Sequence, residues 1–496
     1  MIVKHAPALL VAIPLVAAYL LPLFARRLKH LVVPAALFAL LLCSAGSLSL
    51  LFQVMHTGLI IYHFGNWPPP VGIEFVVDRL AVFTVLTLSL VGFVVLVYSI
   101  DDLRHELRED VRGWYYTLFL TLLASLYGMA MTNDIFNLFV FIEISAIASC
   151  GLISIKEDRA CIEAAFKYLL LSALGSGCIL LAIALLYMVT GHLNMTYLAQ
   201  AMLQAAELYP YNLLASLALL VVGLGIKAAL FPLHVWLPDA HAAAPSPSSA
   251  VLSGLVIKIY AVAMIRLLFQ VYPAAFLART PVAEIILWLS TLAILLGSIF
   301  AMVQEDLKRM LAYSSVAQIG YVFLGVALGS ENALTGGILH IFNHAVMKAL
   351  LFLAAGAFIY ATGTRKIRDL SGIGQTMPAA GVAFAIGALS MVGIPLTNGF
   401  VSKWYLALGA LDAGRPFFTA IVLVSSLLNG IYFLPILINA FFRKPSGNAA
   451  APRALPTPMT AAIVVLAAAV IVFGFFPGRM AGIVVLAVHR LLGVWQ

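Results

Sequence analysis

The sequence predicts an all-α membrane protein with about 14 transmembrane helices, including two inverted five-helix repeats that each contain one broken helix. Of its 496 residues, 63% are hydrophobic and only 10% are charged, whereas soluble domains carry about 25% charged residues. Apolar runs of roughly the 20 residues needed to cross a bilayer follow one another along the chain. Ionisable residues and helix breakers at matching places inside these runs predict the repeats.

About 14 such runs can be placed. Their centres lie roughly near residues 16, 43, 90, 123, 145, 176, 221, 258, 292, 319, 347, 390, 428 and 466. The tail from Pro477 onward is apolar but contains Arg479, His489 and Arg490. We expect it to lie along the membrane surface as an interfacial helix rather than to cross the membrane.

The basic residues support this count of spans. Of the 28 Lys and Arg residues, 16 lie in segments that follow odd-numbered spans, and 7 lie on the other side, termini included. Because basic residues collect in cytoplasmic loops, both termini are expected on the non-cytoplasmic side of the cell (inner) membrane. A basic chain can bind nucleic acid, but this positive charge lies in short loops between apolar runs. The expected partner is therefore the lipid bilayer, not nucleic acid.

Five basic residues remain, and all of them fall within spans: Lys167, Lys227, Lys258, Lys348 and Lys403. A charged residue at the centre of a membrane helix costs roughly 2.5–3.5 kcal/mol on insertion scales. Lys167 lies near the start of its span, where its long side chain can reach the surface, so we expect a structural role for it. The other four lysines indicate a polar interior with a function.

Glu143 and Lys227 are expected to form a pair. In the sequence, Glu143 is the only carboxylate deep in an apolar span. Lys227 follows two glycines, Gly223 and Gly225, and precedes Pro232. Glycine and proline beside a buried charge indicate a broken helix, whose free backbone groups can line a water-containing cavity. The alternative is an ion pair that only holds two helices together.

Lys403 follows a second interruption, formed by Gly393, Pro395, Asn398 and Gly399. Two broken helices that each carry a lysine, five spans apart, indicate an inverted repeat, because an odd spacing reverses the orientation in the membrane. The chain then divides into helices 1–3 (1–112), a first repeat (113–275), a second repeat (276–443), and the last helix with its tail (444–496).

Polar residues surround Lys258. Ser249 and Ser253 precede it at spacings that can place all three on one helix face. His234 and His241 lie between the spans of Lys227 and Lys258. We expect these histidines either at the non-cytoplasmic or central end of a path or as simple caps of a loop.

His340, His344 and Lys348 recur every four residues and therefore share one helix face. Such a row can pass a proton between hydrogen-bonding groups. Two histidines at this spacing could also bind a metal or a haem, but no third or fourth metal ligand is apparent. The chain has no nucleotide-binding glycine motif and no cysteine cluster among its four cysteines. We expect no cofactor, no metal and no catalytic residue here, so partner proteins must supply the energy.

Lysine suits proton transfer because burial disfavours its charged form, whereas a nearby carboxylate favours it. At about 4 Å and an effective dielectric constant of 20, such a pair interacts by roughly 4 kcal/mol. We expect Glu143 to modulate Lys227, and Lys258 to link the two halves. His344 would continue the relay, and Lys403 would pass the proton to the far exit.

Two stretches of sequence resemble a known family. They are Asn-Leu-Phe-Val-Phe-Ile-Glu, ending at Glu143, and Ile-Lys-Ala-Ala-Leu-Phe-Pro-Leu-His-Val-Trp-Leu-Pro-Asp-Ala-His, ending at His241. They resemble the antiporter-like subunits of complex I, a family that includes the D-type subunits of Mrp antiporters and the membrane arms of respiratory hydrogenases. The resemblance covers essentially the whole chain and implies a central polar axis for Glu143, Lys227, Lys258, His344 and Lys403.

The chain departs from this family at two places: Gln318 stands where some members carry histidine, and Lys403 where others carry glutamate. The resemblance implies a proton-translocating subunit of a redox-driven complex. Its partners would be homologous antiporter-like subunits, small membrane subunits and peripheral iron–sulfur or nickel–iron subunits. The alternatives are a subunit of an Mrp-type Na⁺/proton antiporter without redox coupling, a passive scaffold and a membrane cytochrome.

Overall fold

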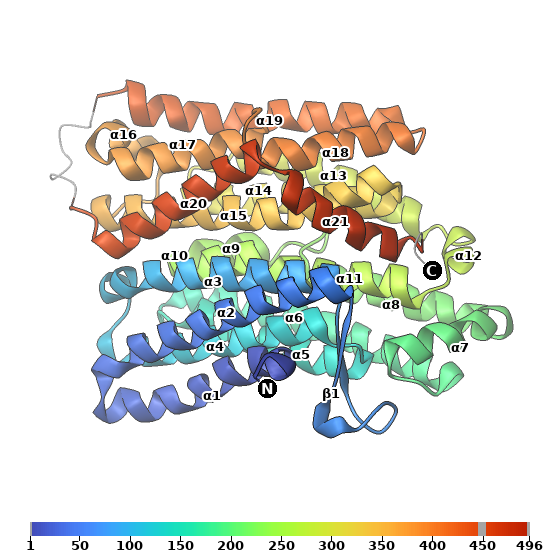
Figure 1. Ribbon diagram of the computed structural model, residues 1–496. Helices are drawn as coiled ribbons and strands as arrows, with labels where there is room; N and C mark the ends of the chain where they lie inside the picture. Colours follow the sequence, from blue (N-terminus) through green and yellow to red (C-terminus); the bar gives the residue numbers. More distant parts are fainter. Residues whose placement is uncertain (1, 445–452, 494–496) are drawn as a thin grey trace.

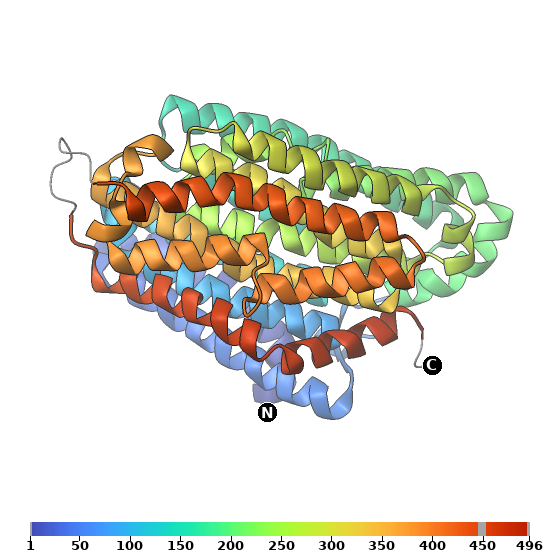
Figure 2. The same ribbon diagram turned by 90° about the horizontal axis from the view of Figure 1, so that it is seen from above.

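The computed structural model describes residues 2–444 and 453–493, and it consists almost wholly of helices. Figure 1 and Figure 2 show the long helices side by side in one bundle. Among the described residues, 13 helices are long and apolar enough to cross a membrane. The protein is therefore a multi-pass α-helical membrane protein, as predicted. Residues 445–452 and 494–496 of the expected last segment lie outside the described residues.

The N-terminal part contains helices and one hairpin. Its elements are η1 (Ile2–His5), α1 (Ala6–Arg27), η2 (Lys29–Leu31), α2 (Val32–Thr57), β1 (Ile60–His63), η3 (Phe64–Asn66), β2 (Glu74–Val77) and α3 (Arg79–Glu106). The antiparallel pairing of β1 with β2, with Ile60 opposite Val77, was not predicted. Both strands are rich in β-branched and aromatic residues, which favour extended backbone. Asp78 then starts α3, because its Oδ1 accepts a hydrogen bond from the Ala81 amide at 2.8 Å.

The next part holds the first interrupted helix. Its elements are α4 (Glu109–Met131), α5 (Ile135–Ser154), α6 (Arg159–Thr190), α7 (Met195–Leu208), α8 (Pro210–Lys227), α9 (Leu237–Ala243), α10 (Ser246–Val251), η4 (Leu252–Val256), α11 (Ile257–Arg266), η5 (Leu267–Val271) and α12 (Ala274–Ala278). The predicted break is present: α8 ends at Lys227, and regular helix resumes only at Leu237.

The remaining part holds the second interruption. Its elements are α13 (Val282–Met302), α14 (Leu307–Leu328), α15 (Glu331–Thr362), η6 (Ile367–Leu370), α16 (Ile373–Thr376), α17 (Pro378–Val392), α18 (Asn398–Asp412), α19 (Pro416–Phe442), α20 (Thr457–Phe475) and α21 (Gly478–Leu491). The expected span near residue 390 is thus two shorter helices, α17 and α18. The break begins at Gly393, whose φ of 90° is in the left-handed region that glycine tolerates best.

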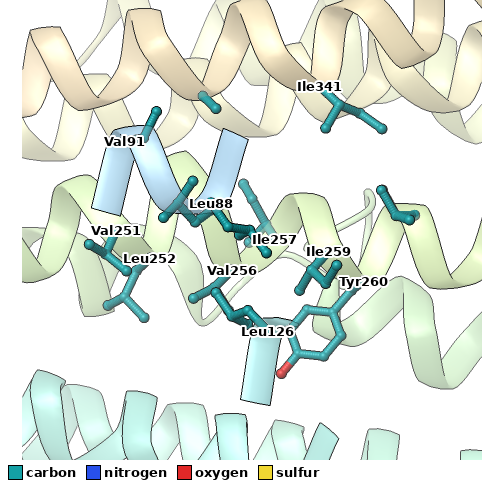
Figure 3. Close-up of a cluster of buried hydrophobic side chains, with 14 of the residues drawn as sticks. Leu88, Val91, Leu126, Val251, Leu252, Val256, Ile257, Ile259, Tyr260 and Ile341 are labelled. Atoms are coloured by element: carbon teal, nitrogen blue, oxygen red, sulfur yellow. The ribbon is translucent and has the colours of Figure 1, made fainter. Parts of the chain in front are cut away.

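The helix from Ser246 to Val271 lies at the centre of the bundle, and its most apolar window is completely buried. Figure 3 shows side chains of this helix on both of its sides: Ile257 lies beside Leu88 of α3, and Val256 lies beside Leu126 of α4. The η4 and η5 segments are π-helical and lie before and after α11. Lys258 is therefore on the most enclosed helix of the protein.

One end of the bundle, at the left of Figure 1, is formed by the segments that join α3 to α4, α5 to α6, α13 to α14 and α15 to η6, and we call it the basic end. Ion pairs cross-link these segments. Arg108 Nη2 lies 2.9 Å from Glu157 Oε2, and Arg365 Nε lies 3.1 Å from Asp306 Oδ2. Most of the loop charges counted in the sequence therefore gather on one face.

The C-terminal tail does not lie across an end of the bundle. In Figure 1, α21 continues along the bundle beyond the end of α20. Gly474 in α20 packs against the backbone of Leu396 in the α17–α18 break, and Arg490 Nε in α21 reaches within 4.0 Å of Asp78 Oδ2 at the start of α3. This course differs from the expected surface placement, because the apolar face of α21, which includes Val484 and Val488, is buried against the other helices.

Candidate functional site

The first helix break places Lys227 in contact with α5 and α6. Lys227 is only 2% exposed, and its Nζ donates a hydrogen bond to Ser172 Oγ at 2.6 Å. Glu143 Oε1 lies 3.5 Å from the same Nζ and accepts a hydrogen bond from Ser176. The structure therefore brings together the two residues that the sequence suggested as a pair.

The two members of this pair have different surroundings. The Lys227 side chain is 1% exposed, whereas the Glu143 side chain is 38% exposed. On the same face of α5, Val140 is 39% exposed and Ile147 is 66% exposed. Glu143 thus opens onto an apolar outer face of the bundle, while Lys227 points into the interior.

Lys258 lies on α11, and its Nζ donates a hydrogen bond to the carbonyl of Ser253 in η4. Ser253 Oγ in turn lies 2.8 Å from Ser315 Oγ of α14. Ser249 is placed differently: its Oγ donates to the carbonyls of His241 and Pro245 at 2.9 and 3.2 Å. Ser253 therefore lies beside Lys258, whereas Ser249 attaches α10 to α9.

The expected row on α15 is buried along its whole length, because His340, His344 and Lys348 are each 0% exposed. The rings of His340 and His344 stack, with centroids 5.6 Å apart and an interplanar angle of 17°. Neither ring nitrogen of His344 has a hydrogen-bond partner within the described ranges, whereas His340 and Lys348 are both hydrogen-bonded. Among these three groups, His344 is therefore the one with a ring nitrogen free to accept a proton.

The two ends of this row are fixed to neighbouring helices. His340 Nδ1 lies 2.9 Å from Ser402 Oγ, and its Nε2 lies 2.9 Å from Gln318 Oε1. Lys348 Nζ donates to Ser314 Oγ at 2.5 Å and to the Leu311 carbonyl at 2.7 Å. The histidine end therefore faces the α18 side of the bundle, and the lysine end is attached to α14.

The second break holds Lys403, which is 4% exposed. Its Nζ donates to the carbonyls of Met391 and Val392 at 2.8 and 3.0 Å and to Ser426 Oγ at 3.1 Å. The same Nζ lies 5.0 Å from the centre of the Tyr321 ring. The end of α17 thus directs its free carbonyls at the lysine, as the negative pole of a helix does toward a cation.

Gly393 leaves space for the Lys403 side chain, because a Cβ added at this glycine would lie 2.9 Å from Lys403 Cδ. Gly393→Ala is expected to displace the lysine and to destabilise the protein by about 1–3 kcal/mol, the usual cost of a strained left-handed residue. The thermal midpoint of the purified protein measures this effect. Gly177→Ala is the control, since no atom lies within 4 Å of its added Cβ, and equal losses in both variants would contradict the prediction.

The two histidines between the spans of Lys227 and Lys258 are buried: His241 is 0% exposed and His234 is 5% exposed. His241 lies on α9, where Lys167 and Arg309 pair with Asp239 at 3.1 and 3.2 Å. His234 lies in the first break and stacks on Phe231 with ring centroids 5.3 Å apart.

Among the buried charges that escaped the sequence analysis are Asp78, Asp102, Arg266 and Lys308, and the Glu106 side chain is only 10% exposed. The sequence pattern places Lys308 and Arg266 in loops, yet they are only 2% and 3% exposed. Asp102 is 1% exposed, so Glu143 is not the only carboxylate within the bundle. Each of these residues lies at the end of an apolar run, where the sequence pattern does not separate a loop from a helix terminus.

Comparison with known proteins agrees with this arrangement. The family described as "NADH:quinone oxidoreductase/Mrp antiporter, TM" matches residues 132–429. The chain is 41% identical over 489 residues to NADH-quinone oxidoreductase subunit N of Desulforudis audaxviator, covering 95% of this chain and 96% of that protein. It is 32% identical over 470 residues to the D-type subunit of the Na(+)/H(+) antiporter of Alkalihalophilus pseudofirmus, covering 94% and 92%.

A solved structure has the same fold. A chain of the membrane-bound sulfane sulfur reductase, an archaeal respiratory membrane complex, superposes with a TM-score of 0.91 and 32% sequence identity, over 99% of this chain and 98% of that one. The family match covers more than half of this sequence, and the similarity to the relatives extends over nearly all of it. This chain therefore belongs to the NADH:quinone oxidoreductase/Mrp antiporter transmembrane family.

Proposed function

We propose that this chain is the proton-translocating, antiporter-like subunit of a redox-driven membrane complex, either complex I-like or membrane-bound hydrogenase-like. One observation carries the proposal: Lys227, Lys258, Lys348 and Lys403 are all at most 4% exposed inside a bundle built to cross a membrane. Buried membrane lysines are costly, and they are retained where they have a function.

The proposed path follows the residues of the two breaks and the central helices. Glu143 modulates the charge of Lys227, and Lys258 links the two halves. His344 accepts the proton next, and Lys403 releases it at the far side. His340, Gln318 and Ser402 support this last step, because they join α14, α15 and α18 through hydrogen bonds of 2.9 Å.

The exposed part of Glu143 supports the presence of membrane partners. A carboxylate that is 38% exposed on an apolar outer face would be costly in contact with lipid. A neighbouring subunit covering this face of α5 removes that cost. We propose homologous antiporter-like subunits and small membrane subunits as neighbours, and peripheral iron–sulfur or nickel–iron subunits as the source of energy. In this proposal the present chain holds no cofactor, and both termini lie outside the cytoplasm of the cell.

Lys403→Gln tests the path in the assembled complex. Reconstituted in closed vesicles with a pH-sensitive dye, this variant is expected to move protons about 100-fold more slowly or worse, the scale of losing one positioned proton-transfer group. Lys167→Gln is the matched control, because the Lys167 side chain is 47% exposed and pairs with Glu163 at 2.8 Å. Normal transport by Lys403→Gln would contradict the proposed path.

A subunit of an Mrp-type cation/proton antiporter is the second candidate, favoured by the 32% identity to the D-type subunit of a Na(+)/H(+) antiporter over 94% of this chain. Mass spectrometry of the intact native complex distinguishes the two. Iron–sulfur or nickel–iron subunits in the complex would rule out the antiporter without redox coupling. A complex without them, which moves protons only when a Na⁺ gradient is applied, would rule out the redox-driven pump.

A further inference from the structure

The basic end contains a cluster of buried charges that the path described above does not use. Asp102 and Glu106 lie four residues apart in the last turns of α3 and therefore share one helix face. Lys308 lies in the first turn of α14, and Lys156 lies in the segment between α5 and α6. Lys156 forms an ion pair with Glu106. Lys308 donates to the carbonyl of Ala244, two residues before Ser246, whose Oγ donates a hydrogen bond to Glu106.

Exposure falls step by step through this cluster. The Lys156 side chain is 25% exposed and forms an ion pair with the Glu106 carboxylate, which is 10% exposed. Ser246 Oγ donates a hydrogen bond to the other oxygen of Glu106, Oε1, at 3.2 Å. One turn earlier on α3, Asp102 is 1% exposed. The cluster therefore leads from the surface into the bundle.

Its inner part contains polar atoms with no hydrogen-bond partner. Within the described residues, these atoms include Asp102 Oδ2, the Tyr98 hydroxyl and both ring nitrogens of His241. A Cβ added at Gly356 would lie 2.7 Å from the Tyr98 hydroxyl and 2.9 Å from Ser246 Oγ, so the glycine leaves space where these hydroxyls approach α15. A buried carboxylate oxygen without a partner is costly, and binding a proton reduces that cost.

The cluster continues toward the central lysines. Lys308 Nζ donates to the carbonyl of Ala244, three residues after His241. His241 and Lys348 both lie beside Phe352: the His241 and Phe352 ring centroids are 5.3 Å apart, and Lys348 Nζ lies 5.9 Å from the Phe352 centroid. His241 is therefore placed between the basic-end cluster and Lys348.

We propose that Asp102 and Glu106 form a proton-uptake site at the basic end, which loads Lys348 through Lys308 and His241. A proton from water binds the carboxylate pair beside Lys156. The Lys308 ammonium gives its proton to neutral His241, and the protonated Asp102 restores the ammonium. The resulting imidazolium passes its proton to neutral Lys348 and returns to the neutral form. This inference rests on the proposed function, because it needs a proton-conducting path to supply.

Asp102→Asn in the assembled complex tests the uptake site. Proton transport per complex is expected to fall about tenfold or more. Acidifying the solution at the basic end is expected to restore part of the transport rate. At a higher proton concentration, Lys308 and His241 can be protonated without the help of the Asp102 carboxylate. A merely structural role would give no such recovery. Asp101→Asn is the matched control, because this neighbouring side chain is 16% exposed and pairs with Arg104 at 2.9 Å; its transport should stay normal.

Two further variants test the uptake site even if Asp102→Asn lowers the amount of assembled complex. Asp102→Glu keeps the carboxyl group and should recover most of the rate. Glu106→Gln, nearer the surface, should slow transport in the same direction by a smaller factor. Normal rates per complex in both Asp102→Asn and Glu106→Gln would overturn the uptake site alone, provided that Lys403→Gln still blocks transport. Normal transport by Lys403→Gln would instead overturn the proposed function.

Discussion

Lys227→Ala is expected to stop proton transport while the protein still assembles. The lysine is 2% exposed, and its ammonium contacts both Ser172 Oγ and Glu143 Oε1, so its removal deprives Glu143 of the cation with which it pairs. The expected loss is about 100-fold or greater, measured as dye-reported proton movement in vesicles that contain the native complex. Blue native electrophoresis of the same membranes reports the assembly.

The control for this variant is Lys29→Ala, which also removes a lysine paired with a glutamate. The Lys29 and Glu109 side chains are both 66% exposed, with Nζ 2.7 Å from Oε1, and such surface pairs contribute only about 0–1 kcal/mol. Its transport should be unchanged. If Lys227→Ala assembled and pumped normally, this chain would be a scaffold for a neighbouring pump.

Arg266→Leu is expected to cause the largest loss of stability. Arg266 Nη2 lies 3.6 Å from Asp78 Oδ1, with side-chain exposures of 4% and 3%, and its guanidinium also donates to the carbonyls of Thr132 and Val76 at 3.2 Å. It therefore joins α11 to the hairpin and to the α4–α5 junction. Removing one member of a buried ion pair costs about 3–5 kcal/mol, because the other charge stays buried. The thermal midpoint of the detergent-purified protein should fall accordingly.

Arg415→Leu is the matched control. Arg415 also pairs with a carboxylate, with Nη1 2.6 Å from Glu284 Oε2, but both side chains are nearly half exposed, at 46% and 47%. Its loss should be within about 1 kcal/mol. Similar losses in the two arginine variants would mean that burial does not set the strength of the Arg266 pair.

The sequence was sufficient for the features that depend on local chemistry. Apolar length predicted the spans, and glycine and proline beside Lys227 and Lys403 predicted both breaks. The insertion cost of a buried charge singled out these two lysines. In each case the physical cause lies within a short stretch of sequence. It is a proline that lacks a backbone amide hydrogen, a glycine that adopts a left-handed backbone conformation, or a lysine ammonium group among apolar neighbours.

The features that the sequence did not reveal depend on tertiary packing. Asp102 and Lys308 lie in polar stretches that resemble loops, and only the packing of α3 against α10 and of α14 against α9 buries them. The same holds for Arg266, whose partners come from residues more than 130 positions earlier in the chain. The hairpin of β1 and β2 is too short for its alternation to stand out among long apolar runs.

The contact between Gly474 and Leu396 has a mechanical consequence. Because no side chain at position 474 separates α20 from the backbone of the α17–α18 break, a shift of the backbone at Leu396 is expected to move the junction between α20 and α21. Since α21 reaches Asp78, at the opposite end from the basic loops, this contact forms a mechanical connection between the second break and the start of α3.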